Sequence, residues 1–231
     1  MRLTRHIMGM PTSLDIPGAE PDVFEAAFER LIEIDHRFST YKNDSEVSRF
    51  GRGELKEKDI SDELKSVIKA SKDAERLTGG YFSAWAGGVF DPSGYVKGWA
   101  IAEAGKVIEN SGYKTYCLGA GGDILARSDS GRLWNIGIQD PLDRGKILNK
   151  LSITDGAVCT SGSYERGAHI INPKTGEPAN ELLSVTVTGP DVIMADILAT
   201  ACFAMGYKAA EFMKRQKGYQ ALIIRNRGNN L

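Results

Sequence analysis

The chain has 231 residues, of which 42% are hydrophobic and 26% are charged, and its formal net charge is −1. This length predicts a single domain over residues 1–231, and a charge near zero gives no general attraction to nucleic acid or to acidic membranes. No run of about 18 apolar residues is present, so no spanning helix is expected, and a charged N-terminus without an apolar stretch predicts a cytoplasmic protein with no leader or membrane anchor.

The N-terminal half is predicted to form an edge hairpin followed by helices. Alternating apolar and polar residues predict the strands. Pro21 favours a helix start, and apolar residues continue from there at helical spacing. Two later helices begin at Asp and Ser residues of the kind that cap helices. The expected segments are strands at 3–8 and 12–16, helices at 21–38, 45–50, 62–78 and 95–110, and a glycine-rich loop at 80–94.

The C-terminal half is predicted to be richer in strands. Helices are expected at 192–205 and, after Gly206, to about residue 217, with a long loop at 167–183. The expected strands are 114–118, 123–127, 133–138, 147–153, 156–159, 184–189 and 219–225. Helices and strands alternate irregularly and the strands cluster in the middle, so the predicted fold class is α+β, a single domain with mixed or antiparallel sheets and flanking helices.

Glycine is unusually frequent, with 26 residues that concentrate in loops between 79 and 176. Such loops let the backbone approach a ligand closely, although a turn-rich fold also uses them. Gly121-Gly122-Asp123 is interpreted either as a hairpin turn or as a main-chain contact in which Asp123 holds a polar group of a ligand. Lys97, near the start of a helix, is either an exposed lysine or part of an anion or flavin-edge site.

Asp196 and Thr200 are the strongest candidates for metal ligands. They lie four residues apart on a predicted helix, so they share one face. A carboxylate and a hydroxyl are hard oxygen ligands of the kind that Mg²⁺ takes together with substrate phosphates. The alternative is a threonine that hydrogen-bonds back to the carbonyl one turn earlier.

Three further segments carry side chains that can bind or react. The pair Thr160-Ser161 offers hydroxyls after a strand, or simply a surface turn. His169, one of three histidines, is a candidate general base, or else a local hydrogen-bonding residue. Tyr41 can stack on a flat ring, or belong to a helix connector.

Taken in chain order, these motifs resemble the FAD:protein FMN transferases, the ApbE family. The resemblance covers residues from about 6 to 225. The matching phrases are Ser39-Thr-Tyr41…Asp44-Ser45-Glu46, Gly80-Tyr-Phe82, Asp91-Pro-Ser-Gly…Lys97-Gly98, Gly121-Gly122-Asp123, Thr160-Ser-Gly-Ser-Tyr-Glu-Arg166, His169-Ile-Ile-Asn-Pro-Lys-Thr-Gly176 and Ala195-Asp-Ile-Leu-Ala-Thr200.

The resemblance implies an α+β fold around a flavin cleft and a Mg²⁺-dependent enzyme. FAD is cut at its pyrophosphate, FMN is joined through a phosphoester to a Thr or Ser of an acceptor protein, and AMP leaves. Asp196 and Thr200 then resemble the metal ligands, with a backbone carbonyl near Ala120 as a third, and His169 resembles the base. The residues that resemble FAD contacts are Tyr41, Lys97, Gly121, Gly122, Asp123, Thr160 and Ser161.

The chain departs from the family pattern between Phe82 and Asp91, where a long insertion is usual, and Ser83 stands where an Asp is frequent. A shorter loop predicts a more open flavin or acceptor site. Two alternatives to the transferase remain open at this stage: a Mg²⁺-dependent FAD pyrophosphatase that releases FMN and AMP, and a non-catalytic FAD-binding protein.

Overall fold

The fold centres on one large antiparallel sheet. The structure is a computed structural model that describes residues 1–163 and 170–226. Seven strands form the sheet in the order β1-β2-β3-β4-β7-β8-β9, and every neighbouring pair is antiparallel. Their bounds are Arg2–Ile7, Met10–Asp15, Tyr116–Ala120, Asp123–Arg127, Gly156–Gly162, Leu182–Gly189 and Gln220–Arg225.

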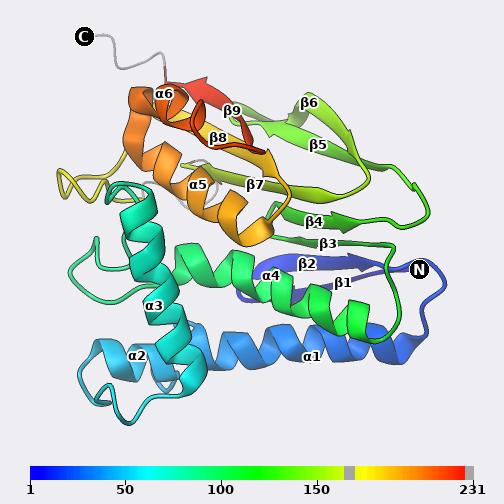
Figure 1. The fold of residues 1–231 in the computed structure, drawn as a ribbon, viewed down its shortest axis with the longest axis horizontal. Helices are drawn as coiled ribbons and strands as arrows, with labels where there is room; N and C mark the ends of the chain where they lie inside the picture. The colour runs from blue at the N-terminus through cyan, green and yellow to red at the C-terminus, as the bar shows by residue number, and fades with distance from the viewer. Residues whose placement is uncertain (164–169, 227–231) are drawn as a thin grey trace.

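Helices cover one face of this sheet, where α1, α4 and α5 lie side by side (Figure 1). The helices are α1 (Pro21–Phe38), α2 (Glu46–Gly51), α3 (Asp62–Leu77), α4 (Ser93–Asn110), α5 (Val192–Met205) and α6 (Ala209–Met213), with a short 3₁₀ turn at Gly206–Lys208. Helix α1 buries a stripe of apolar residues at helical spacing, as its sequence predicts. Helix α5 is buried on nearly all sides, so it forms the centre of the helical layer.

The core lies between the sheet and these helices. Alternate residues of each strand point to opposite faces, and the apolar set that faces the helices includes Leu14, Leu118, Leu125, Cys159 and Val187, all buried. Burying such side chains is the main favourable contribution to folding, roughly 1.5–3 kcal/mol for each large aliphatic group. The alternation therefore fixes which strand residues reach the helical side.

A separate hairpin is formed by β5 (Trp134–Asp140) and β6 (Asp143–Ile153). One side of β5 is buried through Trp134 and Ile136, and the indole Nε1 of Trp134 donates to the carbonyl oxygen of Arg127 at 3.2 Å. Most of β6 is exposed. The hairpin is thus attached to the end of β4 and takes no part in the main sheet.

The predicted elements are confirmed, but several of their ends need correction. Strand β1 ends at Ile7 and β6 begins already at Asp143. Strand β7 runs to Gly162, because Thr160 and Ser161 pair with Thr186 and Val185 of β8. The prediction that Thr160 and Ser161 belong to a loop after the strand is therefore wrong. The last helix ends at Met213 rather than near residue 217, and a turn leads from there into β9.

One stretch of the described chain, Val192–Met213, is long and apolar enough to cross a membrane on length and composition alone. Within the molecule, 72% of its most apolar window is buried. A helix at the centre of a protein core passes the same test, and α5 occupies that place here.

Candidate functional site

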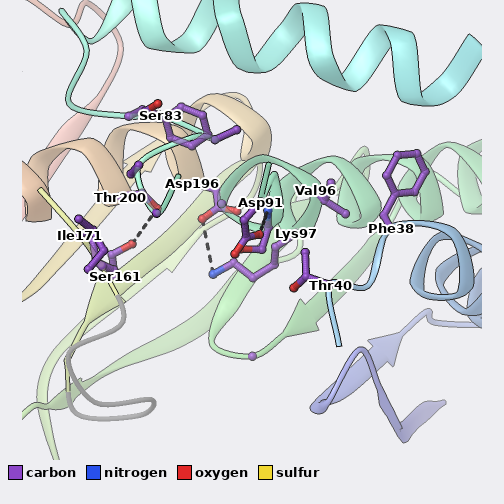
Figure 2. Close-up of a pocket in the computed structure, with 18 of the residues that line it drawn as sticks. Phe38, Thr40, Ser83, Asp91, Val96, Lys97, Ser161, Ile171, Asp196 and Thr200 are labelled. Carbon is purple, nitrogen blue, oxygen red and sulfur yellow. Dashed lines mark hydrogen bonds and ion pairs between the residues drawn. The ribbon is translucent and has the colours of Figure 1, made fainter. Parts of the chain in front are cut away.

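A cleft of about 320 Å³ opens at one end of the sheet. The turn between β1 and β2, the turn between β3 and β4, the end of α1, the start of α4 and the end of β7 all contribute residues to it. Figure 2 shows its side chains converging from α4, α5 and β7. This size is within the range of small-molecule sites, roughly 300–1,000 Å³.

Three charged residues, of which the two aspartates are buried, form a cluster on one wall of the cleft. Lys97 Nζ of α4 lies 2.7 Å from Asp123 Oδ2 and 3.5 Å from Asp196 Oδ1. The shorter contact is a close ion pair rather than an aligned hydrogen bond. Asp123 is fully buried and Asp196 nearly so, whereas Lys97 keeps 21% of its side chain exposed. The cluster therefore reaches the cleft through Lys97 and Asp196.

Backbone groups hold the two carboxylates in place. Asp196 Oδ2 accepts a hydrogen bond from the backbone N–H of Gly98 at 2.9 Å, and Asp123 Oδ1 accepts one from Thr160 N–H at 2.9 Å. A Cβ at position 98 would lie 3.0 Å from the carbonyl oxygen of Val192, so only glycine lets α4 approach α5 this closely. The cluster thus joins two helices and two strands.

The charges of this cluster are unbalanced, because one ammonium group faces two carboxylates. Burial raises the pKa of Asp196 above its ordinary value, and the nearby Lys97 acts in the opposite direction. Burial by itself disfavours the charged form of Lys97, but the two carboxylates outweigh it and raise the pKa of Lys97. A divalent cation beside Asp196 would favour the charged, carboxylate form of this side chain.

Thr200 follows Asp196 by one helical turn and lies on the same side of α5 (Figure 2). Its hydroxyl shares a hydrogen bond with Ser161 Oγ of β7 at 3.2 Å. Both hydroxyls line the cleft with Asp196. The alternative, in which Thr200 bonds back to its own helix, is not the arrangement found in this part of the chain.

The oxygen atoms of Asp196 and Thr200 are of the kind that bind hard divalent cations such as magnesium. No group of three or more His, Cys, Asp or Glu side chains is placed to hold a metal within residues 1–163 and 170–226. Zinc and calcium sites commonly use such groups. Magnesium instead takes one or two carboxylates and completes its coordination with water and substrate phosphates.

Most of the predicted site residues come together. The residues among them that line the cleft are Tyr41, Lys97, Gly121, Thr160, Ser161, Asp196 and Thr200. Tyr41 is 87% exposed at the cleft, as a free stacking surface would be. His169 lies outside the described residues, although Ile170 and Ile171, which follow it, line the cleft.

Three predicted residues are placed behind the wall of the cleft or beside it. Asp123 is buried, with its oxygens facing Lys97 and the backbone of Thr160. Ala120 is buried at the end of β3, and Gly122 is exposed in the following turn. Asp123 can therefore influence a ligand through Lys97, whereas its neighbour Gly121 contributes directly to the lining.

The sequence alone did not indicate two methionines that also line the cleft, Met8 and Met10. They flank Gly9 in the turn between β1 and β2, where the strand was expected to continue through residue 8. The available signal was Gly9, since the two-residue type I′ hairpin turn favours glycine at its second position.

Comparison with known families and sequences gives one consistent result. The profile described as the ApbE family matches residues 8–91 and 86–223. A protein named FAD:protein FMN transferase from Klebsiella pneumoniae is 30% identical over 144 residues, covering 57% of this chain and 41% of that protein. One of the same name from Treponema pallidum is 40% identical over 114 residues, covering 45% and 32%. These matches span less than half of either relative, whereas a Vibrio cholerae relative of that name is 26% identical with 82% and 76% covered.

Solved structures show the same fold. The ApbE protein of Thermotoga maritima superposes with a TM-score of 0.84, at 24% identity, over 96% of this chain and 93% of that one. The flavin transferase ApbE of Vibrio cholerae gives a TM-score of 0.80 at 23% identity, over 97% and 93%. At these identities the likeness concerns the arrangement of helices and strands.

Proposed function

The chain belongs to the ApbE family, and from this premise we propose that it is a Mg²⁺-dependent FAD:protein FMN transferase. The observation that carries the proposal is the convergence of Asp196, Thr200 and Lys97 on one cleft, with Asp123 behind them. These groups supply hard oxygen ligands and one partly exposed positive charge. Such a set suits a ligand that combines a metal ion with a pyrophosphate.

The proposed reaction exchanges the phosphoanhydride bond within the pyrophosphate of FAD for a phosphoester bond to the acceptor protein. The hydroxyl oxygen of a Thr or Ser in the acceptor protein forms a bond to the phosphorus of the FMN half of FAD. The bond from that phosphorus to the bridging oxygen of the pyrophosphate breaks, and AMP leaves with the bridging oxygen. The hydroxyl proton passes to a base, for which His169 is the candidate. A positioned base typically contributes about 10²–10⁴-fold to such a step.

Within the cleft, we assign the pyrophosphate to the wall formed by α4 and α5. Asp196 and Thr200 would hold the metal ion, whose positive charge offsets the phosphate charges and polarises phosphorus towards attack. Lys97 is partly exposed to the cleft and stays charged beside its two carboxylates. Its ammonium group can therefore contact a phosphate oxygen without leaving Asp123.

Ser161 supports this arrangement by holding the hydroxyl of Thr200. Gly121 has a positive φ of 56°, which lets the backbone of the β3–β4 turn approach a ligand. Tyr41, exposed at the cleft, offers a flat surface for one of the rings of FAD.

The experiment that tests this function is an incubation of the purified protein with FAD and Mg²⁺, with and without an acceptor protein that carries an exposed threonine. The proposal expects AMP release that depends on the acceptor, together with fluorescent flavin that stays on the acceptor after denaturation. AMP released equally without acceptor would identify a pyrophosphatase instead. Bound FAD with no AMP in either reaction would identify a binding protein.

A further inference from the structure

One side of helix α3 carries a row of cations, which we call the α3 stripe. It consists of Lys65, Lys69, Lys72 and Arg76, all of them exposed. Residues spaced three and four apart share one side of a helix, and a rise of 1.5 Å per residue makes the stripe about 16 Å long. Helix α3 runs across one end of α1 and α4 instead of lying beside them (Figure 1). The stripe is therefore open to a partner.

The α3 stripe borders a shallow hollow of about 230 Å³. The buried side chain of Ile68 lines it, and Glu57 contributes from the segment that precedes α3. All four cations line the hollow, whereas the carboxylates among its lining residues are only those of Glu57 and Asp73. This part of the surface is therefore positive, although the net charge of the chain is −1.

The stripe leads to the rim of the cleft. Lys72 Nζ lies 5.9 Å from the centroid of the Trp85 ring, and the residues directly before and after Trp85 line the cleft. The loop that carries Trp85 is fixed to the end of α3, because the Thr78 hydroxyl accepts a hydrogen bond from the backbone N–H of Phe82 at 3.0 Å. A molecule bound along the stripe would thus have one end beside the cleft.

The form of the stripe favours an extended acidic peptide over other polyanions. Its length of about 16 Å matches about five residues of extended chain. A helix that binds a membrane surface needs an exposed apolar face, but apolar side chains of α3 such as Leu64 and Val67 are buried. Duplex nucleic acid is bound by broad basic surfaces, whereas the stripe is one residue wide and Asp73 pairs with Lys69 and Arg76 beside it.

We propose that the α3 stripe is a docking surface for the acceptor protein, where it binds an extended acidic segment next to the residue that receives FMN. This inference rests on the proposed function for the identity of the partner. The carboxylates of the segment pair with the lysines, while the target hydroxyl enters the cleft beyond Trp85. Complementary charges of this kind select the partner and speed its association.

Two fluorescein-labelled peptides test the docking surface without FAD. Each carries one threonine beside a run of five residues, which are glutamates in the first peptide and glutamines in the second. In anisotropy titrations the glutamate peptide should bind more tightly, and added salt should remove the difference. The double variant Lys69→Gln/Lys72→Gln should weaken its binding by about threefold to tenfold. Glutamine has a helix propensity close to that of lysine, so the melting temperature should stay near the wild-type value.

The matched control is Lys146→Gln/Lys150→Gln in β6, which removes the same charge from two exposed lysines four residues apart. Equal losses in the two double variants would overturn the inference, because they would report net charge alone. Equal binding of the two peptides by the wild-type protein would also overturn it. So would binding of phosphatidylserine vesicles or duplex DNA that is lost in Lys69→Gln/Lys72→Gln, without a preference for the glutamate peptide.

Transfer kinetics separate docking from the reaction. With FAD and Mg²⁺, the KM for the glutamate peptide should rise about threefold to tenfold in Lys69→Gln/Lys72→Gln, while kcat and the Kd for FAD stay unchanged. A fall in kcat with an unchanged KM would contradict a docking role. Peptide binding that depends on the stripe, without AMP release, would reject the transferase proposal and leave the docking surface. Transfer that does not depend on the stripe would do the reverse.

Discussion

Two clusters of ion pairs in this molecule have similar composition but different surroundings. The cleft cluster consists of Lys97, Asp123 and Asp196, and the two carboxylates are at most 2% exposed. The helix cluster links Arg30 and Arg37 to glutamates of neighbouring helices, and its side chains are 17–43% exposed. Both join several elements, so connecting helices cannot be what distinguishes them.

The difference lies in the desolvation of charge. Partly exposed pairs such as Arg30–Glu63, at 2.7 Å, keep part of their hydration, and ion pairs at the surface contribute little, typically about 0–1 kcal/mol each. Buried charges lose their hydration, which often costs more than the ion pair returns. Well-packed apolar side chains would connect α4 and α5 at no loss of stability, or even with a gain, because they need no desolvation of charge. The comparison therefore attributes the cleft cluster to function and the helix cluster to the packing of helices.

The largest expected effect is the loss of transfer activity in the variant Asp196→Ala. Lys97 keeps Asp123 as its partner, so the fold should survive and flavin binding should be partly retained. Transfer should fall below detection, because the proposed metal site loses its carboxylate. The measurement is AMP release and covalent flavin on an acceptor, beside FAD binding by fluorescence. Full activity in this variant would reject the metal assignment.

The largest expected effect on folding is in Lys97→Met. This change leaves two buried carboxylates without a counter-charge, which should lower the free energy of unfolding by about 3–5 kcal/mol. Urea unfolding followed by circular dichroism measures it. Combining Lys97→Met with Asp123→Asn should recover part of the loss, because one of the uncompensated charges is removed. A loss below about 1 kcal/mol for Lys97→Met would place this cluster with the surface pairs.

A smaller effect is expected in Ser161→Ala. Thr200 would lose the hydrogen bond that orients its hydroxyl, and a neutral hydrogen bond contributes about 0.5–1.5 kcal/mol. The Mg²⁺ concentration for half-maximal AMP release should therefore rise about twofold to tenfold. Ser184→Ala is the matched control, since Ser184 is also a buried strand serine but does not line the cleft. Equal shifts in both variants would show that Ser161 has no specific role.

The smallest effect is expected in the helix cluster, with Arg37→Met. Arg37 pairs with Glu63 and, at 3.8 Å, with Glu46, and its side chain is 43% exposed. Removing the charge should lower the free energy of unfolding by about 1 kcal/mol or less and leave transfer unchanged. Urea unfolding and the AMP assay measure both quantities. A loss as large as that of Lys97→Met would remove the distinction between the two clusters.

The sequence predicts well those features that depend on residues close together in the chain. Helical spacing places Asp196 and Thr200 on one side of α5, and caps and apolar periodicity locate α1 and α3 closely. Partners far apart in the chain could not be predicted in this way. Lys97, Asp123 and Asp196 come from three elements, and no local pattern reveals that they meet.

Other features of the site depend on contacts between segments that are far apart in the chain. Glycine and serine after Thr160 favour a loop, but hydrogen bonding to β8 extends β7 through Gly162. The exposure of Met8 in the cleft follows from the contact of two turns, which sequence periodicity does not report. The role of His169 and the cytoplasmic location stay predictions.

The most direct test of the account is a crystal structure of the protein with FAD and Mg²⁺. The account predicts one metal ion about 2.0–2.1 Å from a carboxylate oxygen of Asp196 and from the hydroxyl of Thr200, with the pyrophosphate of FAD completing its coordination. An ion bound without these two residues, or FAD bound away from them, would contradict it.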